Sequence, residues 1–315
     1  MSDREREVKL DHLKLGRSDS TISVIGQGCS TFGFHEKEEI EAICMGLDLG
    51  MNLIDTAEVY SYGLSEKVIG KAIKERRNEA FISTKVASTN LSFNRLLKSA
   101  KRSLDRLGID TIDLYHIHFP NPSIPIKETM LAMEKLVKEG YIRHIGVSNF
   151  SIVELKEAQT AMSREEITSI QVPYNLLQRN IEIELLPYCQ EEHITVIAAS
   201  PLAAGNIESN QNLIEVATRY GKSVSQVALN WLISKQNVVA IPRAKSLEHV
   251  KENASACDWR LSSIDVKALD LAFNEYIQAS QPPVKSIKNS TIRFVNRYSP
   301  QTLRLLLRKI FERAR

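Results

Sequence analysis

The regular alternation of short β-branched runs with longer segments of helical periodicity constrains this chain more than any other feature of its sequence. Eight short runs predict strands, and most of them are continuously apolar, which is typical of parallel strands covered on both faces. The predicted strands span residues 22–25, 52–56, 81–86, 111–117, 142–147, 169–172, 195–199 and 238–241.

The segments between these strands have the spacing of amphipathic helices. In one of them, Leu96, Ala100, Leu104 and Leu107 fall on a single helical face. Ser65 is expected to cap the N-terminus of another. The predicted helices span residues 38–49, 65–74, 94–107, 126–139, 152–161, 185–192 and 224–234.

Eight strand–helix pairs without a break in composition predict an α/β protein with a (β/α)8 TIM barrel. We expect residues 1–278 to form this barrel as a single domain. An open, doubly wound sheet is the competing architecture, and it usually carries G-x-G-x-x-G after its first strand. The sequence GQGCSTFG at residues 26–33 has a different spacing, which favours the barrel.

The composition is that of an ordinary soluble protein, because 43% of the residues are hydrophobic and 25% are charged. No apolar run approaches the 18 residues of a transmembrane helix. The charged N-terminus lacks an apolar signal core, so we expect the protein in the cytoplasm. The four cysteines are too scattered for a disulfide framework or a zinc knuckle, and we expect buried free thiols.

Residues 279–315 are predicted to be a basic C-terminal loop followed by an amphipathic helix. Ser299 and Pro300 form a good helix start. The apolar stripe that follows at helical spacing consists of Leu303, Leu306, Leu307, Ile310 and Phe311. Residues 285–315 carry nine basic side chains and one acid, a net charge of +8, whereas the rest of the chain carries −5.

This charge asymmetry predicts that the C-terminal helix docks on its own acidic barrel. A homo-oligomer contact is the second interpretation, and attachment to anionic lipid or nucleic acid is the third. Proteins that bind nucleic acid more often spread basic charge over a folded face, so we expect a small-molecule substrate and no nucleic-acid partner.

Polar and ionisable side chains gather where the predicted strands end, which is where barrels place their catalytic groups. Such groups are costly inside a barrel mouth unless they are paired or used. They are Asp55, Tyr60, Lys85, His116, His118, Ser148, Asn149 and Gln171.

Four of these residues form a plausible acid catalyst for a carbonyl. A free tyrosine has a pKa near 10, and a neighbouring ammonium lowers it. Lys85 could supply that charge to Tyr60, and Asp55 could hold Lys85 in place and keep it protonated. His118 could donate a hydrogen bond to the carbonyl oxygen or relay a proton to Tyr60.

The sequence argues against two other chemistries. It shows no good nucleophile beside a base, so we do not expect acyl transfer. No His or carboxylate spacing builds a metal site, and His116 with His118 is the nearest candidate. A metal-dependent barrel hydrolase stays as an alternative, and it would lose activity to chelators.

Seven motifs in a fixed order make the chain resemble the aldo-keto reductases over residues 10–275. The motifs are NLIDTAEVYSYGLSE (52–66), FISTKV (81–86), DLYHIHFP (113–120), IGVSNF (145–150), QVPYN (171–175), ASPLAAG (199–205) and IPRAKSLEHVKEN (241–253). The resemblance implies an NADP(H)-dependent oxidoreductase that reversibly reduces an aldehyde or ketone to an alcohol, without metal.

The resemblance also implies roles for individual residues. The family's catalytic tetrad falls on Asp55, Tyr60, Lys85 and His118, with Tyr60 as general acid. His116 falls where the family has no fixed catalytic residue, so it is expected in the core or the pocket wall. The implied substrate pocket consists of Ser30, Tyr60, His118 and Phe119.

The implied cofactor contacts come from the ends of several strands and from one later helix. Arg243, Lys245 and His249 offer positive charge to a 2′-phosphate, which favours NADP(H) over NAD(H). The implied contacts are Gly28, Cys29, Asp55, Ser148, Asn149, Gln171, Ser200, Leu202, Arg243, Lys245, His249 and Asn253.

Two departures from the family pattern affect the pocket. Ala199 stands where the family commonly has an aromatic residue stacked on the nicotinamide ring, and base–aromatic stacking is worth about 1–3 kcal/mol. Phe119 stands where many members have tryptophan. The missing aromatic and the basic tail favour an alternative function, a nucleotide-sensing regulatory subunit with little turnover, whereas the complete tetrad favours the enzyme.

Overall fold

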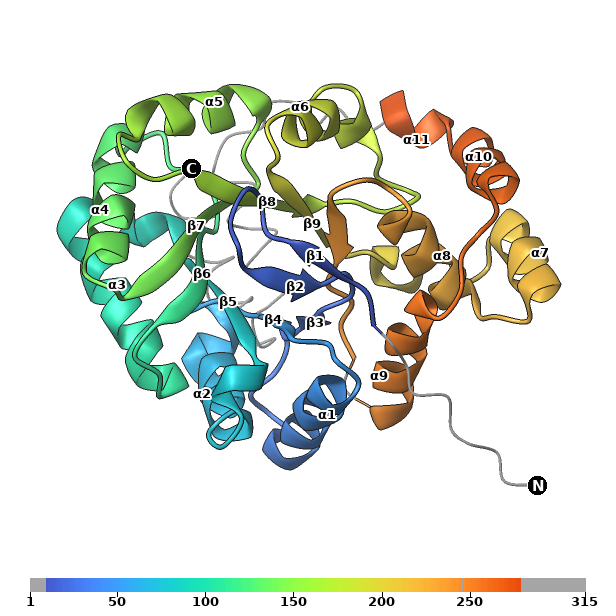
Figure 1. Ribbon diagram of the computed structural model, residues 1–315, viewed down its shortest axis with the longest axis horizontal. Helices are drawn as coiled ribbons and strands as arrows, with labels where there is room; N and C mark the ends of the chain where they lie inside the picture. The colour runs from blue at the N-terminus through green and yellow to red at the C-terminus, as the bar shows by residue number, and fades with distance from the viewer. Residues whose placement is uncertain (1–9, 245, 279–315) are drawn as a thin grey trace, which may run out of the picture.

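The computed structural model describes residues 10–244 and 246–278, and its centre is a single sheet of eight parallel strands (Figure 1). The strands follow one another around the sheet in the order of the chain. They are β3 (Gln27–Gly28), β4 (Leu53–Asp55), β5 (Phe81–Val86), β6 (Ile112–Ile117), β7 (Ile142–Ser148), β8 (Ile167–Pro173), β9 (Thr195–Ala199) and β10 (Val238–Ala240).

Hydrogen bonds between the first and last strands close this sheet. Ile25 forms a parallel bridge with Ala240. The Gly26 N–H donates to the carbonyl of Ala240 over 2.8 Å, and the Gly28 N–H donates to that of Pro242 over 2.9 Å. The predicted (β/α)8 barrel is therefore confirmed.

The predicted first strand, residues 22–25, is right as a barrel strand only in its second half, where Ile25 bridges to Ala240 and the Val24 carbonyl accepts from the Ala240 N–H over 2.9 Å. Its first half belongs to β2 (Thr21–Ser23), which pairs antiparallel with β1 (His12–Lys14) in a hairpin across the centre of the ring (Figure 1). Ile22 is apolar because it packs with Leu15 against the first residues of strands such as Leu53. The hairpin thus covers the N-terminal end of the barrel, and the GQGCSTFG segment itself supplies β3.

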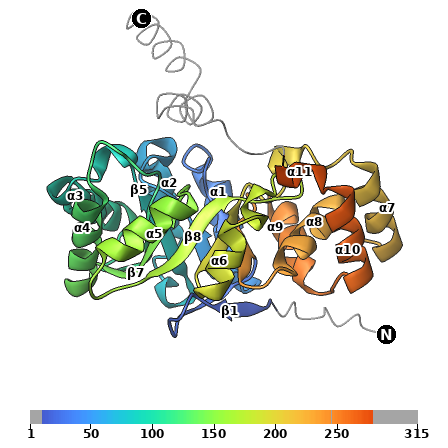
Figure 2. The ribbon, with the colours of Figure 1, turned by 90° about the horizontal axis from the view of Figure 1, so that it is seen from above.

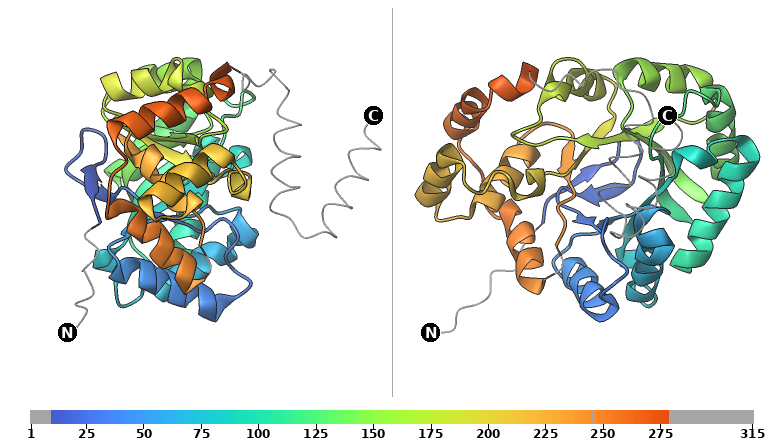
Figure 3. Two further views of the ribbon diagram at one scale, coloured as in Figure 1. Left: turned by 90° about the vertical axis from the view of Figure 1, so that its right-hand side faces the viewer. Right: turned by 180° about the vertical axis from the view of Figure 1, so that it is seen from behind.

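A ring of helices surrounds the strands on the outside (Figure 3). Seven lie within a few residues of the predicted positions, whereas α7, α9, α10 and α11 were not predicted. The helices are α1 (Glu36–Asp48), α2 (Leu64–Ala72), α3 (Phe93–Leu107), α4 (Ile126–Lys138), α5 (Ile152–Ala161), α6 (Leu185–Glu191), α7 (Gln211–Tyr220), α8 (Val224–Ile233), α9 (Leu247–Ala254), α10 (Ser263–Ala272) and α11 (Glu275–Gln278).

Three smaller predictions can be compared with these elements. The N-cap of α2 is Gly63, so Ser65 as a cap is wrong; its hydroxyl instead donates to the carbonyl of Cys29 over 2.9 Å. All four cysteines are free, as predicted. Over the described ranges, each helix is too short or too polar to cross a bilayer. The basic extension at residues 279–315 lies outside the described residues.

A buried ion-pair cluster fastens the loop after β8 to the last helices. The Arg179 guanidinium is 2% exposed and donates to both carboxylate oxygens of Glu182 over 2.8 Å. It also donates to Asp270 on α10, which accepts further hydrogen bonds from Trp231 and Lys235 on and after α8. The cluster therefore joins the loop after β8 to α8 and α10 (Figure 2). The backbone N–H of Arg179 also donates to the carbonyl of Tyr276 on α11.

We predict that Arg179→Met lowers the free energy of unfolding by about 3 kcal/mol, because it removes the buried guanidinium that pairs with the half-buried carboxylates of Glu182 and Asp270. The measurement is urea denaturation. Arg219→Met is the matched control, since Arg219 pairs with Asp265 at the surface and its loss should cost about 0–1 kcal/mol. Equal losses in the two variants would contradict a special contribution from the cluster.

Candidate active site

A buried ion pair lies at the mouth of the barrel. The ammonium of Lys85 on β5 donates to the two carboxylate oxygens of Asp55, at the end of β4, over 2.8 and 2.7 Å. Its third hydrogen bond goes to the carbonyl of Thr56 over 2.7 Å. The Lys85 side chain is 0% exposed, and this burial lowers its pKa while the charge of Asp55 opposes the shift. All three ammonium protons are used, so its position is fixed.

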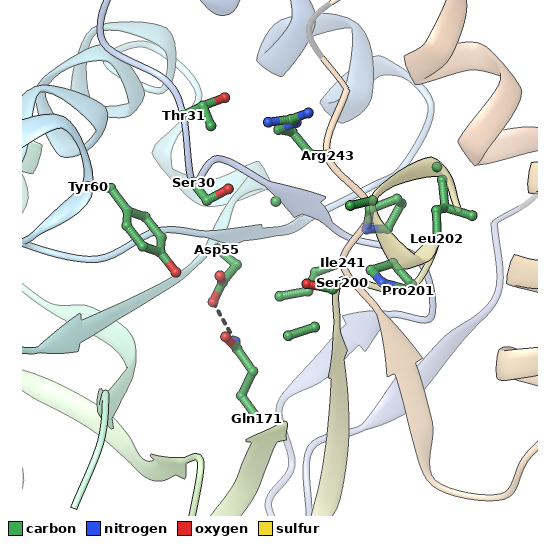
Figure 4. A pocket seen from close by; sticks show the side chains of 15 residues that line it. Ser30, Thr31, Asp55, Tyr60, Gln171, Ser200, Pro201, Leu202, Ile241 and Arg243 are labelled. Carbon is green, nitrogen blue, oxygen red and sulfur yellow. Dashed lines mark hydrogen bonds between the residues drawn. The ribbon is translucent and has the colours of Figure 1, made fainter. Parts of the chain in front are cut away.

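Asp55 is held by two further donors from other strands. The Ser83 hydroxyl donates to Oδ1 over 2.9 Å, and Nε2 of Gln171 on β8 donates to the same oxygen over 2.8 Å (Figure 4). The carboxylate therefore ties β4, β5 and β8 together at this end of the barrel.

Tyr60 lies beside this ion pair, at the start of the 3-10 helix η1 (Tyr60–Gly63). The centre of its buried ring is 5.3 Å from Nζ of Lys85. The His118 ring, which follows β6, lies edge-on to it with 5.6 Å between the ring centres. The structure thus brings together the four residues predicted for the tetrad.

His118 is surrounded by apolar and cationic neighbours. Burial, and after it the charge of Lys85, lowers its pKa well below the usual value, so the imidazole is neutral. The Phe119 ring stacks on it with 5.0 Å between centres. The His118 ring thus lies between Phe119 and Tyr60, and neither His118 nor Phe119, both predicted for the substrate pocket, is among the residues that line the cavity beside Asp55 and Tyr60.

His116 lies inside the barrel, where the Ser83 hydroxyl lies between it and Asp55. Its Nε2 is 3.0 Å from the Ser169 hydroxyl, and its Nδ1 is 3.3 Å from that of Ser83. Burial lowers its pKa well below the usual value. A neutral, hydrogen-bonded core histidine is therefore what the structure shows.

A cavity of about 310 Å³ opens beside Asp55 and Tyr60 (Figure 4). Eight of the residues predicted for the site line it, together with Ala199: Gly28, Ser30, Asp55, Tyr60, Gln171, Ser200, Leu202 and Arg243. Pro201 lines it too, within the segment of Ser200 to Leu202 predicted for the pyrophosphate, and five lining residues were not predicted: Thr31, Ala204, Gly205, Ile241 and Pro242. They lie next to predicted residues in the same three loops, and this adjacency was the signal that could have found them.

A sequence profile of the Aldo/keto reductase family matches residues 24–273. The chain belongs to this family. The predicted resemblance is therefore confirmed, and with it the expected assignment of the protein to an oxidoreductase family.

Three known proteins are similar to this aldo-keto reductase in sequence, and two of them also in solved structure. Methylglyoxal reductase YeaE of Escherichia coli is 38% identical over 81% of the chain and 92% of its own length. The thermostable aldo-keto reductase Tm1743, solved with the inhibitor epalrestat, is 40% identical, with a TM-score of 0.81 over 83% of this chain and 99% of its own. An aldo-keto reductase from Klebsiella pneumoniae, solved with NADPH, is 34% identical, with a TM-score of 0.80 over 88% and 97%.

Two predicted cofactor residues of this aldo-keto reductase lie just outside the cavity lining. Ser148, at the end of β7, is buried, and Asn149 has a left-handed backbone with a φ of 61°. The Asn149 amide donates to the carbonyl of His118 over 2.9 Å and to the Ser148 hydroxyl over 3.1 Å. Its backbone N–H donates to the carbonyl of Gln171. Asn149 therefore links Ser148 to the backbone of His118 and Gln171.

The remaining predicted cofactor residues have different surroundings. The Cys29 thiol packs in the apolar core, where burial raises its pKa, and only the backbone faces Asp55. On α9, His249 is exposed, whereas Asn253 is buried and its Nδ2 has no hydrogen-bond partner among the described residues. Lys245 lies outside the described residues.

Two absences in the predicted site concern only the described part of the chain. Tyr60 is the one aromatic side chain among the residues that line the cavity, so aliphatic groups such as Leu202 and Ile241 surround Ala199. No group of three His, Cys, Asp or Glu side chains within residues 10–244 and 246–278 is arranged to hold a metal ion.

The lowered pKa values of the two buried histidines imply that the free energy of unfolding depends on pH. Unfolded imidazoles bind protons near pH 6.5, whereas the depressed pKa values of His116 and His118 keep the folded ones neutral. The unfolded state then binds more protons, so the free energy of unfolding falls as the pH drops below about 6.5.

We predict that His116→Gln reduces this loss by up to about 1.4 kcal/mol per pH unit. The measurement is urea denaturation between pH 7.5 and 5.5. His35→Gln is the control, because His35 is exposed and makes no side-chain cap at the start of α1. The same slope in His116→Gln and the unmodified protein would contradict the assignment of His116.

Proposed function

We propose that this aldo-keto reductase reduces an aldehyde or ketone to an alcohol, reversibly, with NADPH as hydride donor and Tyr60 as general acid. The observation that carries the proposal is the packing of the Tyr60 ring against the buried Lys85–Asp55 pair at the wall of a cavity. The Klebsiella relative that was solved with NADPH supports the choice of cofactor.

The lining of the cavity fits a phosphorylated dinucleotide. Arg243 places a cation beside it, and Ser30 and Thr31 line the same part of the cavity (Figure 4). Oγ1 of Thr31 is buried without a partner among the described residues, and so is Nδ2 of Asn253 on α9. Gly28 lets the two cavity-lining segments pack closely, since a Cβ there would lie 2.7 Å from the carbonyl oxygen of Ile241.

The cofactor supplies the hydride when it is bound, and the protein supplies the proton and the orientation. Lys85 holds a positive charge next to the phenol of Tyr60, which favours release of the phenolic proton to a carbonyl oxygen. Asp55 keeps Lys85 charged against the cost of its burial. His118 is neutral, so it can donate one hydrogen bond to the substrate oxygen without competing as an acid.

The proposed substrates are short, reactive carbonyl compounds such as methylglyoxal. The name of the Escherichia coli relative supports this class. The small volume of the cavity, about 310 Å³, and its aliphatic residues Ala199, Leu202 and Ile241 suit the carbon skeleton of a small aldehyde.

We predict that Tyr60→Phe lowers kcat for methylglyoxal by about 10²–10⁴-fold, because it removes the proton donor. NADPH binding should change by less than about twofold, since the substitution leaves the hydrogen bonds from Lys85 to Asp55 and Thr56 in place. Fluorescence titration measures binding, and cofactor oxidation measures turnover. If the unmodified protein binds NADPH but does not oxidise it with any carbonyl compound that is offered, the protein is instead a nucleotide sensor.

We predict that Arg243→Ala weakens NADPH binding by about tenfold and NADH binding much less, because a charge-assisted hydrogen bond to a phosphate is worth more than about 1.4 kcal/mol. The dissociation constants of both cofactors are compared in one buffer. Arg95→Ala on the exposed side of α3 is the charge-matched control. Equal losses for NADPH and NADH would place Arg243 away from the 2′-phosphate.

A further inference from the structure

Glu58 makes a set of contacts that the tetrad does not explain. Its Oε1 accepts from the Ala87 N–H over 2.7 Å and from Nδ2 of Asn90 over 3.0 Å. Its Oε2 accepts from the hydroxyl of Ser99 on α3. The Glu58 carboxylate therefore links its own loop to the loop that follows β5 and to α3.

The residues joined by these contacts lie close in sequence to Tyr60 and Lys85. Glu58 precedes Tyr60 by two residues, and Ala87 follows Lys85 by two residues. The backbone N–H of Glu58 also donates to the carbonyl of Lys85 over 3.2 Å. The Glu58–Ala87 contact thus joins the two short segments that carry the phenol and the ammonium.

The backbone around Tyr60 needs such support. Ser61 and Tyr62 have left-handed φ angles of 48° and 57°, which are unfavourable for residues with a Cβ. Such strained turns persist only where the surrounding structure determines them. On the side of α1, the Glu39 carboxylate holds the N–H of Gly33, which lies against Ser61. On the side of β5, the Glu58 carboxylate in the same way accepts from a backbone N–H, that of Ala87.

We propose that Glu58 is a positioning residue that sets the distance between Tyr60 and Lys85, and this proposal rests on the proposed function. The Glu58 carboxylate accepts its hydrogen bonds from Ala87, Asn90 and Ser99 rather than from the Lys85 ammonium, so the side chain acts on the pair through the loop. Glu58→Ala frees one end of that loop, and small displacements of a catalytic group can cost about 10²-fold in rate.

The conservative variant separates positioning from charge. In Glu58→Gln, the remaining carbonyl oxygen can still accept from Ala87 and Asn90. The new amide can donate to the Ser99 hydroxyl, which is able to accept instead of donating. We therefore expect Glu58→Ala to lower kcat by about 10–100-fold with little change in the NADPH dissociation constant, and Glu58→Gln to recover most of the loss.

Glu134→Ala is the matched control for lost stability. The Glu134 carboxylate also accepts backbone N–H groups, those of Ser163, Arg164 and Glu165, but at the N-terminal end of β8. It should lower the free energy of unfolding about as much as Glu58→Ala and leave kcat unchanged. A kcat loss of equal size in Glu134→Ala would overturn the proposal.

A titration that needs no turnover completes the test. The ¹³Cζ signal of Tyr60 in tyrosine-labelled protein is assigned by its loss in Tyr60→Phe. In Glu58→Ala the midpoint of its titration should move to higher pH as the phenol leaves the ammonium, and in Glu58→Gln it should return. An unmoved midpoint would overturn the positioning role. If the midpoint moves but the unmodified protein reduces no carbonyl, the proposed function fails and the positioning role stands.

Discussion

The buried contact between Lys85 and Asp55 is the interaction on which the site depends. An ammonium without water around it would lose its proton, and the carboxylate prevents this only because five hydrogen bonds fix the pair. Lys85 and Ser83 come from β5, which pairs directly with β4, whereas Gln171 comes from β8, three strands beyond β5 in the sheet. The ion pair is thus made by two neighbouring strands, and the curvature of the barrel adds the donor from β8.

The sequence predicted the tetrad because its members lie at strand ends, where barrels gather polar side chains. It also predicted the parallel barrel and most helix positions, since their apolar periodicity is strong. It misplaced half of the first strand, because β3 is two residues long and shows no periodicity, while Ile22 is apolar for a different reason. The hairpin across the barrel end carries the same β-branched signal as a strand within it.

The missed parts of the site have a common physical origin. Ala204, Gly205 and Pro242 line the cavity with backbone or small apolar groups, and such positions carry no chemical signal in a sequence. Glu58 was part of a recognised motif, but its three partners come from a loop and a helix about 30 to 40 residues further on. Spacing along the chain cannot show which carboxylate reaches such partners.

Closure of the barrel has a consequence for its synthesis. The bond that seals the cylinder joins Gly26 to Ala240, so a ribosome has made more than two hundred residues before the two margins can meet. During that interval the nascent sheet keeps unpaired backbone groups along both margins, and such margins recruit strands from other chains. The step most exposed to misassembly is therefore the arrival of the last strand, and molecular chaperones would be needed most just before it.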